Sequence, residues 1–388
     1  MNILVCNVGS TSLKYQLFAM EQNEAVLKKG GAERVGQEKS LFYTTDPASG
    51  NKQQREAVFP THLEAINAML EAISPEKADC VAFKVVHAKG VTGTQYLTDD
   101  VLSAMEAFNS VAPAHNPPYL AAIRLFRKAM PGTPLIGAFE TAFHSNMPPE
   151  ASLYSIPAEL SRKHEIRRYG FHGASHEYLS QFAAEKLGRQ ACRVISCHLG
   201  GSGSICAVKN GVSVDTTLGL SLQCGVMHNN RCGDIDPYII FYLAEECGMT
   251  LPEIKTMLQT KSGFLGMSGG VSADLRDIEE AASRGNRDCE IAIRSYAYSI
   301  RKYIGAYAAA MGGLDAIVFG GGIGTNSSSV RKLALEGLEF LGVYMDGEKN
   351  SAAADDISVS GSPVRIYLTE TNEEIVVARK AAKLLNAE

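Results

Sequence analysis

Three short turns rich in glycine and serine are the segments of this sequence best suited to bind an anion. They cover residues 9–12 (GSTS), 200–204 (GGSGS) and 320–324 (GGGIG), and each follows an apolar, strand-like run. Such turns allow backbone N–H groups to converge on phosphate oxygens. One turn of this kind is equally typical of an ordinary hairpin, whereas three together favour a site for a phosphate-bearing ligand.

Polar residues in unusually apolar surroundings are the next candidates for chemistry. They are Asn7, Lys84, His115, Glu140, His172, His198, Arg231 and Asp234. A lone histidine is more often structural than catalytic, and none of these residues form a pair with the spacing of zinc ligands. The nine cysteines contain no Cys-x-x-Cys pair and most lie in apolar stretches, so we expect reduced cysteines packed in the core.

The overall composition excludes several classes of protein. The chain has 388 residues, 45% of them hydrophobic, which is enough for two globular domains. A net charge of -5, with no run of five like charges, argues against nucleic acid as a partner. No charged leader precedes an apolar segment and no run of 18 apolar residues occurs, so we expect a cytoplasmic protein without a membrane segment. Neither Gly-x-x-x-x-Gly-Lys-Ser/Thr nor a helix-opening Gly-x-Gly-x-x-Gly is present, so any phosphate must bind to another type of loop.

One strand–turn–strand unit occurs twice along the chain. Strand patterns at 3–7 and 13–18 flank the first Gly/Ser turn, and patterns at 193–198 and 205–208 flank the second. This repeat predicts two related α/β domains with a phosphate-bearing ligand between the two turns. We place the boundary near residue 150, so the first domain covers 1–150 and the second covers 151–372.

Other periodic segments supply the remaining elements. Helices are expected at 61–73, 118–129, 175–187, 237–246, 277–282, 291–311 and 373–385, and strands at 212–215, 316–319 and 364–368. The strand at 316–319 runs directly into the third glycine turn.

Ten motifs, in the same order along the chain, resemble those of the acetate kinase family. They are residues 7–14 (NVGSTSLK), 85–87 (VVH), 112–117 (APAHNP), 141–144 (TAFH), 168–176 (RYGFHGASH), 198–200 (HLG), 215–219 (DTTLG), 231–237 (RCGDIDP), 272–276 (SADLR) and 322–324 (GIG). The resemblance spans nearly the whole chain, and segments 168–176 and 231–237 are its most specific parts. It implies two duplicated actin-like (ribonuclease H-like) domains, each a mixed sheet flanked by helices, with the active site in the cleft between them. It also implies that the C-terminal helix, 373–388, completes the first domain.

The resemblance implies reversible transfer of phosphate between ATP and a short-chain carboxylate, with Mg²⁺, in a homodimer. A carboxylate is already ionised at pH 7, so this reaction needs no general base. Its difficulty is to bring an anion to a polyanion while charge redistributes over the phosphoryl group, which requires cations, hydrogen-bond donors and a metal.

The resemblance assigns roles to residues position by position. Arg231 holds the carboxylate and the transferring phosphoryl group, His172 donates to that group, and His115 and His198 position phosphate. The remaining assignments are Lys84 and Glu140 on the substrate side, Asn7 and Glu373 toward Mg²⁺, Asp274 and Arg276 at the ribose and adenine, and Ser10, Ser12, Lys14, Gly200, Gly201, Gly322 and Gly324 at the nucleotide.

Several positions depart from the family pattern. Lys84 replaces an arginine, Glu140 an aspartate, Gly201 an asparagine, Thr325 a glutamate, Ala114 a leucine and Leu222 a proline, while Val86 and Phe171 remain as apolar walls. A lysine cannot reproduce the bidentate fork of an arginine. The smaller Ala114 leaves room for a larger acyl group unless Leu222 fills that space. We therefore expect propionate or a bulkier acid to be preferred to acetate.

Two other functions remain open from the sequence. The changes at Lys84, Glu140 and Thr325 are compatible with a nucleotide-binding sensor that has lost kinase activity, or with another phosphoryl donor such as pyrophosphate. Arg231, His172, Asn7 and Glu373 favour the catalyst, and Asp274 and Arg276 favour adenosine binding.

Overall fold

The structure, a computed structural model, describes residues 1–111 and 115–387. The chain forms two compact units. Unit 1 consists of Met1–Ser145 together with the C-terminal segment that begins at Asn372, and unit 2 consists of Asn146–Thr371. No helix in the described part of the chain combines the length and apolar character needed to cross a membrane.

An eight-stranded mixed sheet forms the centre of unit 1. Its strand order is β5-β4-β3-β2-β1-β6-β8-β7. The strands are β1 (Asn2–Gly9), β2 (Ser12–Ala19), β3 (Ala25–Glu33), β4 (Ser40–Thr45), β5 (Lys52–Ala57), β6 (Cys80–Val85), β7 (Thr94–Tyr96) and β8 (Leu135–Phe139). β1 pairs antiparallel with β2 and parallel with β6, so it lies in the centre of the sheet, and its apolar residues 3–6 are all buried, as expected for a strand covered on both faces.

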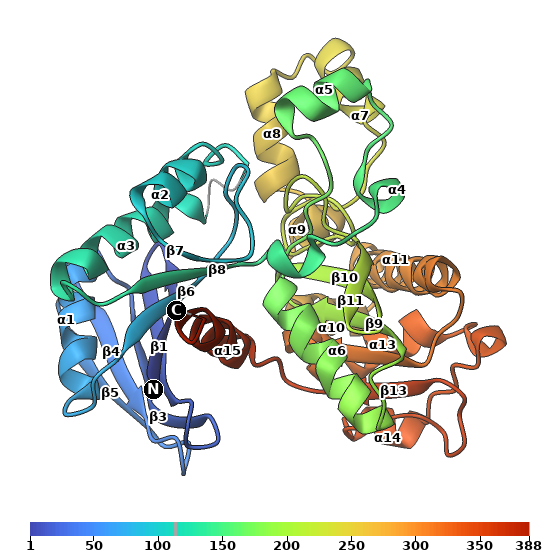
Figure 1. Cartoon of the computed structure of the whole chain (residues 1–388). Coiled ribbons are helices and arrows are strands. Elements are labelled where there is room, and N and C mark those ends of the chain that lie inside the picture. The colour runs from blue at the N-terminus through green and yellow to red at the C-terminus, as the bar shows by residue number, and fades with distance from the viewer. Residues whose placement is uncertain (112–114, 388) are drawn as a thin grey trace. The chain divides into compact units, whose positions relative to one another are not determined.

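Helices cover both faces of this sheet. Its helices are α1 (His62–Ile73), α2 (Asp99–Glu106), α3 (Asn116–Ala129), the short η1 (Ala142–His144) and α15 (Glu373–Leu385). α1 begins at a capping box in which Thr61 and Glu64 satisfy each other's backbone N–H groups. Figure 1 shows α1 and α3 on one face and α15 on the other, where α15 packs against β1, β6 and β8. The C-terminal helix therefore belongs to the core of the first unit.

The sheet of unit 2 repeats the centre of the first sheet. Its order is β11-β10-β9-β12-β13. The strands are β9 (Arg193–Leu199), β10 (Gly203–Lys209), β11 (Val212–Thr216), β12 (Ala316–Gly320) and β13 (Arg365–Leu368). β9 pairs antiparallel with β10 and parallel with β12, just as β1 pairs with β2 and β6. The two related α/β domains expected from the repeated hairpin, which the family resemblance describes as actin-like, are therefore confirmed.

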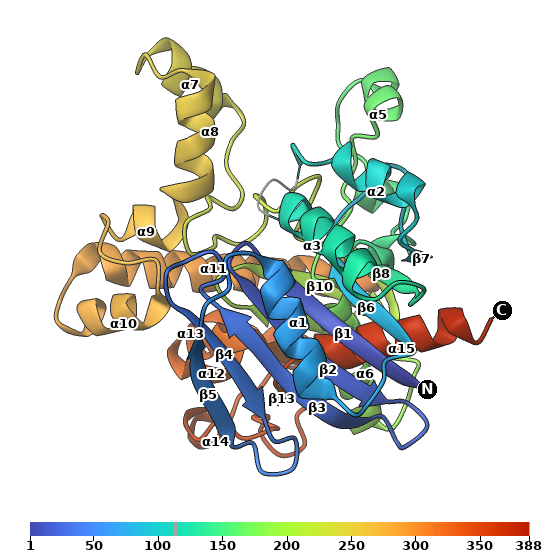
Figure 2. The same ribbon diagram turned by 90° about the vertical axis from the view of Figure 1, so that its left-hand side faces the viewer.

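Two long helices cover the sheet of unit 2. α6 (Gly173–Leu187) packs against β9 and β12, and α11 (Arg287–Met311) packs against β9 and β10. The other helices are α4 (Pro149–Ser152), α5 (Ala158–His164), α7 (Tyr238–Glu245), α8 (Leu251–Thr260), α9 (Gly263–Met267), α10 (Leu275–Ser283), α12 (Gly321–Asn326), α13 (Ser328–Leu335), η2 (Glu339–Leu341) and α14 (Gly347–Ser351). Figure 2 shows α7 and α8 extending away from the sheet of their unit.

One local prediction was wrong. Residues 320–324 were expected to form a turn, but helix α12 begins at Gly321 directly after β12. Gly321 has φ of +76°, and a Cβ there would lie 2.6 Å from the carbonyl oxygen of Leu199. The glycines therefore allow a sharp change from strand to helix against β9.

Candidate functional site

A cavity of about 570 Å³ in unit 2 is lined by five of the ten residues predicted to bind a nucleotide. Its lining consists of Gly200, Gly201, Asn229, Asp274, Leu275, Arg276, Glu279, Gly322, Ile323, Asn326 and Ser327. Gly324 and His198 are not part of this lining. The cavity is thus formed by the turn after β9, the start of α10 and the start of α12.

Asp274 and Arg276 hold each other at one side of this cavity. Asp274 is the N-cap of α10, and its Oδ1 accepts from the backbone N–H of Arg276 at 2.9 Å. The guanidinium of Arg276 donates to Oδ2 at 2.6 Å, and this contact lowers the pKa of Asp274 to about 2. A planar guanidinium, which donates hydrogen bonds, and a carboxylate, which accepts them, therefore lie together at this side of the cavity. Such a pair can bind a ribose hydroxyl and the edge of a base.

Two of the predicted histidines lie next to each other in unit 2. The ring centroids of His172 and His198 are 4.4 Å apart. His172 Nδ1 is 2.8 Å from the Ser204 hydroxyl, and His198 Nδ1 is 2.7 Å from the Ser175 hydroxyl. Serines therefore fix both rings through Nδ1.

His176 extends this network into the core. Its Nε2 lies 2.7 Å from Ser204 Oγ and its Nδ1 lies 2.7 Å from Ser196 Oγ. His176, Ser196 and Ser204 are fully buried. Ser204 thus links His172 to a buried histidine, and we assign Ser204 and His176 to positioning His172.

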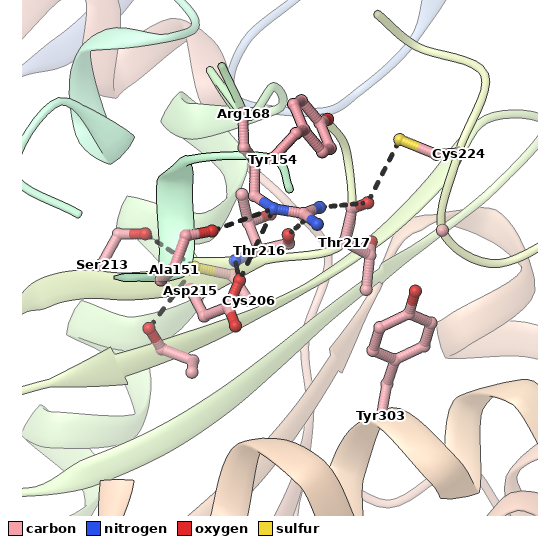
Figure 3. A network of polar contacts seen from close by, with 12 residues as sticks. Ala151, Tyr154, Arg168, Cys206, Ser213, Asp215, Thr216, Thr217, Cys224 and Tyr303 are labelled. Carbon is pink, nitrogen blue, oxygen red and sulfur yellow. Dashed lines mark hydrogen bonds and ion pairs between the residues drawn. The ribbon is translucent and has the colours of Figure 1, made fainter. Parts of the chain in front are cut away.

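His172 is held in an unusual backbone conformation. It precedes α6 with φ of +57°, a region that residues other than glycine rarely adopt, so the surrounding structure must enforce it. Arg168, four residues earlier, donates to the carbonyl oxygens of Thr216 and Thr217 at 2.8 and 3.0 Å. Figure 3 shows its guanidinium between these carbonyls, Ala151 and Asp215. Arg168 therefore anchors the segment that presents His172 to the end of β11.

Arg231 lies in a tight turn between β11 and α7. Its Nη1 donates to the carbonyl oxygen of Leu222 at 2.7 Å, and burial lowers the pKa of its guanidinium. An arginine nevertheless stays charged at neutral pH. A half-buried cation with donors to spare is suited to a carboxylate or phosphate.

Lys84, Glu140 and Glu373 form one charged cluster in unit 1. Lys84 Nζ lies 2.5 Å from Glu373 Oε2 and 3.3 Å from Glu140 Oε1. Burial opposes the charged form of Lys84, but Glu140 and Glu373 outweigh it and raise the pKa of this amine well above its ordinary value. The lysine expected on the substrate side is thus already paired with two carboxylates.

Asn7 adjoins this cluster through a tyrosine. The hydroxyl of Tyr119, on α3, donates to Asn7 Oδ1 at 2.9 Å, and Tyr119 lies close enough to Lys84, Glu140 and Glu373 to interact with their charges. Asn7 faces Lys14 across the first hairpin, in which Ser10 lies in the turn and Ser12 begins β2. His115 is the N-cap residue of α3, one turn before Tyr119.

The departures from the family pattern fall at defined places. Leu222 is buried and offers its carbonyl to Arg231, while Thr325 donates from Oγ1 to the carbonyl of Gly321 within α12. Val86 and Phe171 are buried. Ala114 lies outside the described residues.

Sequence reasoning missed the residues that connect the site. Tyr119 and Asn229 lie outside the quoted motifs, while Ser204 and His176 lie inside quoted segments, but the contacts of all four join segments far apart in the chain and were not indicated by the sequence. Arg168 lies inside a motif that the sequence analysis quoted, but nothing in its spacing indicated the carbonyls that it binds.

The repeated sheets and the glycine-lined cavity define a protein of the duplicated actin-like class. The sequence profile of the Acetokinase family matches residues 2–379. An acetate kinase from Geobacillus sp. (strain WCH70) is 43% identical over 396 residues, covering 99% of either chain. Two solved structures, an acetate kinase from Porphyromonas gingivalis (37% identity, TM-score 0.89, 99% of both chains) and a propionate kinase from Francisella tularensis (33%, 0.90, 98% of both), are also similar. The chain therefore belongs to the acetokinase family, and it is a phosphotransferase with a carboxyl group as acceptor.

Proposed function

We propose that this protein transfers the γ-phosphoryl group of ATP reversibly to a short-chain carboxylate, giving an acyl phosphate and ADP. The cavity in unit 2 carries the proposal, because it is lined by five of the residues that the family resemblance assigns to the nucleotide: Gly200, Gly201, Asp274, Arg276 and Gly322. The similar proteins named as acetate and propionate kinases support an acceptor of two or three carbons.

The chemistry proposed is a direct in-line transfer. A carboxylate oxygen attacks the γ-phosphorus, and the bond from that phosphorus to the β–γ bridging oxygen breaks, with its electron pair leaving on ADP. No proton is transferred, so His172 and His198 serve as hydrogen-bond donors to phosphate oxygens. Arg231 supplies the positive charge that stabilises both anions in the transition state.

Asn7 and Glu373, in unit 1, offer the amide oxygen and the carboxylate that we propose for a metal ion, and in the structure Asn7 Oδ1 accepts from Tyr119 and Glu373 Oε2 is paired with Lys84. In residues 1–111 and 115–387, no group of three or more His, Cys, Asp or Glu side chains is close enough to hold a metal. Mg²⁺ typically keeps several waters and takes one or two protein oxygens together with phosphate oxygens, so an amide and a carboxylate suffice. When bound, it would neutralise charge on the transferring phosphoryl group.

The identity of the acid depends on the substrate side. Leu222 is the described residue that we expect to limit acyl length. A hydroxamate assay of the purified protein with ATP, Mg²⁺ and carboxylates of one to five carbons tests this. We expect propionate or a bulkier acid to exceed acetate in kcat/KM, and a clear preference for acetate would contradict the enlarged pocket. Failure to form hydroxamate from any acid would contradict the kinase itself.

A homodimer is proposed on the basis of α7. This helix buries none of its residues within the chain, and Tyr238, Phe241 and Tyr242 are 75%, 53% and 63% exposed. Exposed apolar surface of this kind marks an interface between proteins. Light scattering should give twice the mass of the chain, and Phe241→Glu should reduce it to the monomer. A monomeric wild-type protein would contradict this. The cytoplasmic location stays a prediction.

A further inference from the structure

Asn229 lines the cavity that we propose binds the nucleotide. It lies in none of the ten motifs, and the sequence alone did not indicate it as a site residue. Its side chain lines the cavity beside Gly201. A Cβ added to Gly201 would lie 3.0 Å from Asn229 Nδ2 and 3.4 Å from Cγ. The amide therefore lies over the glycine, in space that a side chain at position 201 would need.

The backbone around Asn229 is held from two sides. Its N–H donates to the carbonyl of Gly201 at 3.0 Å, and its own carbonyl accepts from Leu265 at 2.9 Å. The preceding His228 is fully buried and accepts from the N–H of Gly203 through Nδ1 at 3.0 Å. The turn that carries Asn229 is thus fastened to the Gly/Ser turn after β9.

The side-chain amide, in contrast, is uncommitted. No described residue makes a hydrogen bond with it, and the residue is half-buried at the wall of the cavity. Asn326 also lines the cavity, but its Nδ2 already donates to the carbonyl of Gly322 at 2.8 Å. Asn229 therefore has two N–H donors available to a ligand in the cavity.

The position of Asn229 indicates which part of a nucleotide it meets. Consecutive Cα atoms are about 3.8 Å apart, so Asn229 lies within about 8 Å of Arg231, and Gly201 within about 11 Å of His198. Arg231 and His198 are the residues assigned to phosphate, whereas Asp274 and Arg276 are assigned to ribose and adenine. Asn229 is thus closer along the chain to Arg231, which is assigned to phosphate, than to the residues assigned to ribose and adenine.

We propose that the side-chain amide of Asn229 donates a hydrogen bond to a phosphate oxygen of the bound nucleotide, and that Gly201 lacks a side chain so that this amide can take its place. The inference rests on the proposed function, because it assumes that the cavity binds ATP. It assigns a nucleotide-binding residue that the family resemblance does not, at a position where the amide of the family pattern at 201 is missing.

Asn229→Gly and Asn229→Asp test the contact. A hydrogen bond to a charged group is worth enough that its loss should raise the KM for ATP about tenfold in Asn229→Gly, with a smaller change in kcat. Asn229→Asp keeps the shape but places a carboxylate against phosphate, so its KM should rise further. Calorimetry should show adenosine binding within about twofold of wild type for Asn229→Gly, because adenosine has no phosphate.

Variants that exchange the residues at positions 201 and 229 give a second test, with the affinity for ATP as the measurement. Gly201→Asn alone should weaken ATP binding, since its side chain would crowd Asn229. The double variant Gly201→Asn, Asn229→Gly restores one amide to the same space and should recover most of the affinity. Asn230→Asp is the matched control, since it adds the same charge one residue away without lining the cavity.

The possible outcomes distinguish failure of this inference from failure of the proposed function on which it rests. If wild-type protein binds ATP and forms acyl phosphate, but Asn229→Gly and Asn229→Asp keep the wild-type KM for ATP, the inference is wrong and the function stands. An equal loss of adenosine and ATP binding would also overturn it, because it would show a structural role. If wild-type protein binds no ATP, the proposed function itself fails.

Discussion

The imidazole rings of His172 and His198 lie 4.4 Å apart between centroids, with their planes inclined by 34°. They come from different elements, the start of α6 and the end of β9, and each is bonded at Nδ1 by a serine hydroxyl. The serine hydroxyls thus fix the orientation of both rings, which supports the proposed role of His172 and His198 as hydrogen-bond donors to phosphate.

Ser204→Ala tests the positioning of His172. The variant removes the hydroxyl shared by His172 and His176, so His172 should lose its fixed orientation. We expect kcat to fall roughly tenfold or more, with the KM for ATP changed less. Steady-state kinetics with the hydroxamate assay measures both constants.

Ser213→Ala is the control for this change. Ser213 is also a fully buried serine in the same sheet, but its hydroxyl lies 3.2 Å from Cys206 Sγ rather than beside a histidine. It should keep kcat close to wild type. Equal losses of kcat in the two variants would show that Ser204 acts only on stability.

Lys84→Met tests the charged cluster of unit 1. Removing the ammonium leaves Glu140 and Glu373, which are 5% and 14% exposed, without their cation. The free energy of unfolding should fall by about 3 kcal/mol, and turnover should be lost. Urea unfolding of variant and wild type measures the difference.

The pH dependence of this difference has a defined sign. The folded-state pKa of Lys84 is raised above its ordinary value of 10.5, so its stabilisation is complete below that pH and is lost as the pH rises through the folded pKa. The difference between wild type and Lys84→Met should therefore be constant from about pH 7 to pH 9 and narrow only above pH 10.5. A difference that shrinks between pH 7 and pH 9 would show that Lys84 is not held charged by Glu140 and Glu373.

Lys84 and Glu140 should behave as a matched pair. Both depart from the family pattern, and the longer glutamate compensates for the shorter reach of lysine across their 3.3 Å contact. Lys84→Arg and Glu140→Asp should each lower kcat/KM. The kcat/KM of the double variant should be about fivefold higher than the value expected if the two single losses simply multiplied. Losses that simply multiply in this cycle would show that Lys84 and Glu140 are not coupled in their effect on kcat/KM.

Arg331→Met tests the support beneath α12. Arg331 is fully buried and donates to the carbonyls of Gly324, Thr325 and Asn350, with no carboxylate within 4.0 Å among the described residues. The variant leaves these carbonyls without their donor, so we expect a loss of roughly 3 kcal/mol in the free energy of unfolding and a higher KM for ATP. Arg284→Met removes an exposed arginine and should change the stability by less than about 1 kcal/mol. If both variants unfold at the same urea concentration, Arg331 does not support this helix.

Much of the fold could be predicted because its signals are local. β1, β9 and β10 are short apolar runs beside Gly/Ser turns, β2 alternates apolar and polar residues, and α11 has a long apolar face. β5 (KQQREA) was not predicted, because an edge strand of polar, exposed residues has no such alternation. Residues 320–324 were misjudged because glycines favour turns, while the packing against β9 decides in favour of a helix.

The site could be predicted only where it lies within motifs. Arg231 and His172 lie within the most specific motifs. Ser204, in contrast, contacts histidines at the start of α6 only because β10 packs beside that helix. Asn229 likewise contacts Gly201 only because its turn packs against the loop after β9. Such contacts are properties of the tertiary structure. The pairing of Lys84 with Glu373 joins residues 289 positions apart, and no spacing rule could have found it.

Arg231 is the cation that we propose holds the carboxylate and the phosphoryl group together. Wild-type protein and Arg231→Ala should be compared in the hydroxamate assay with ATP, Mg²⁺ and the best acid, alongside ATP binding by calorimetry. We predict that the wild type forms acyl phosphate and that the variant loses about a thousandfold or more of this rate while it still binds ATP. A variant that turns over at the wild-type rate would contradict the mechanism.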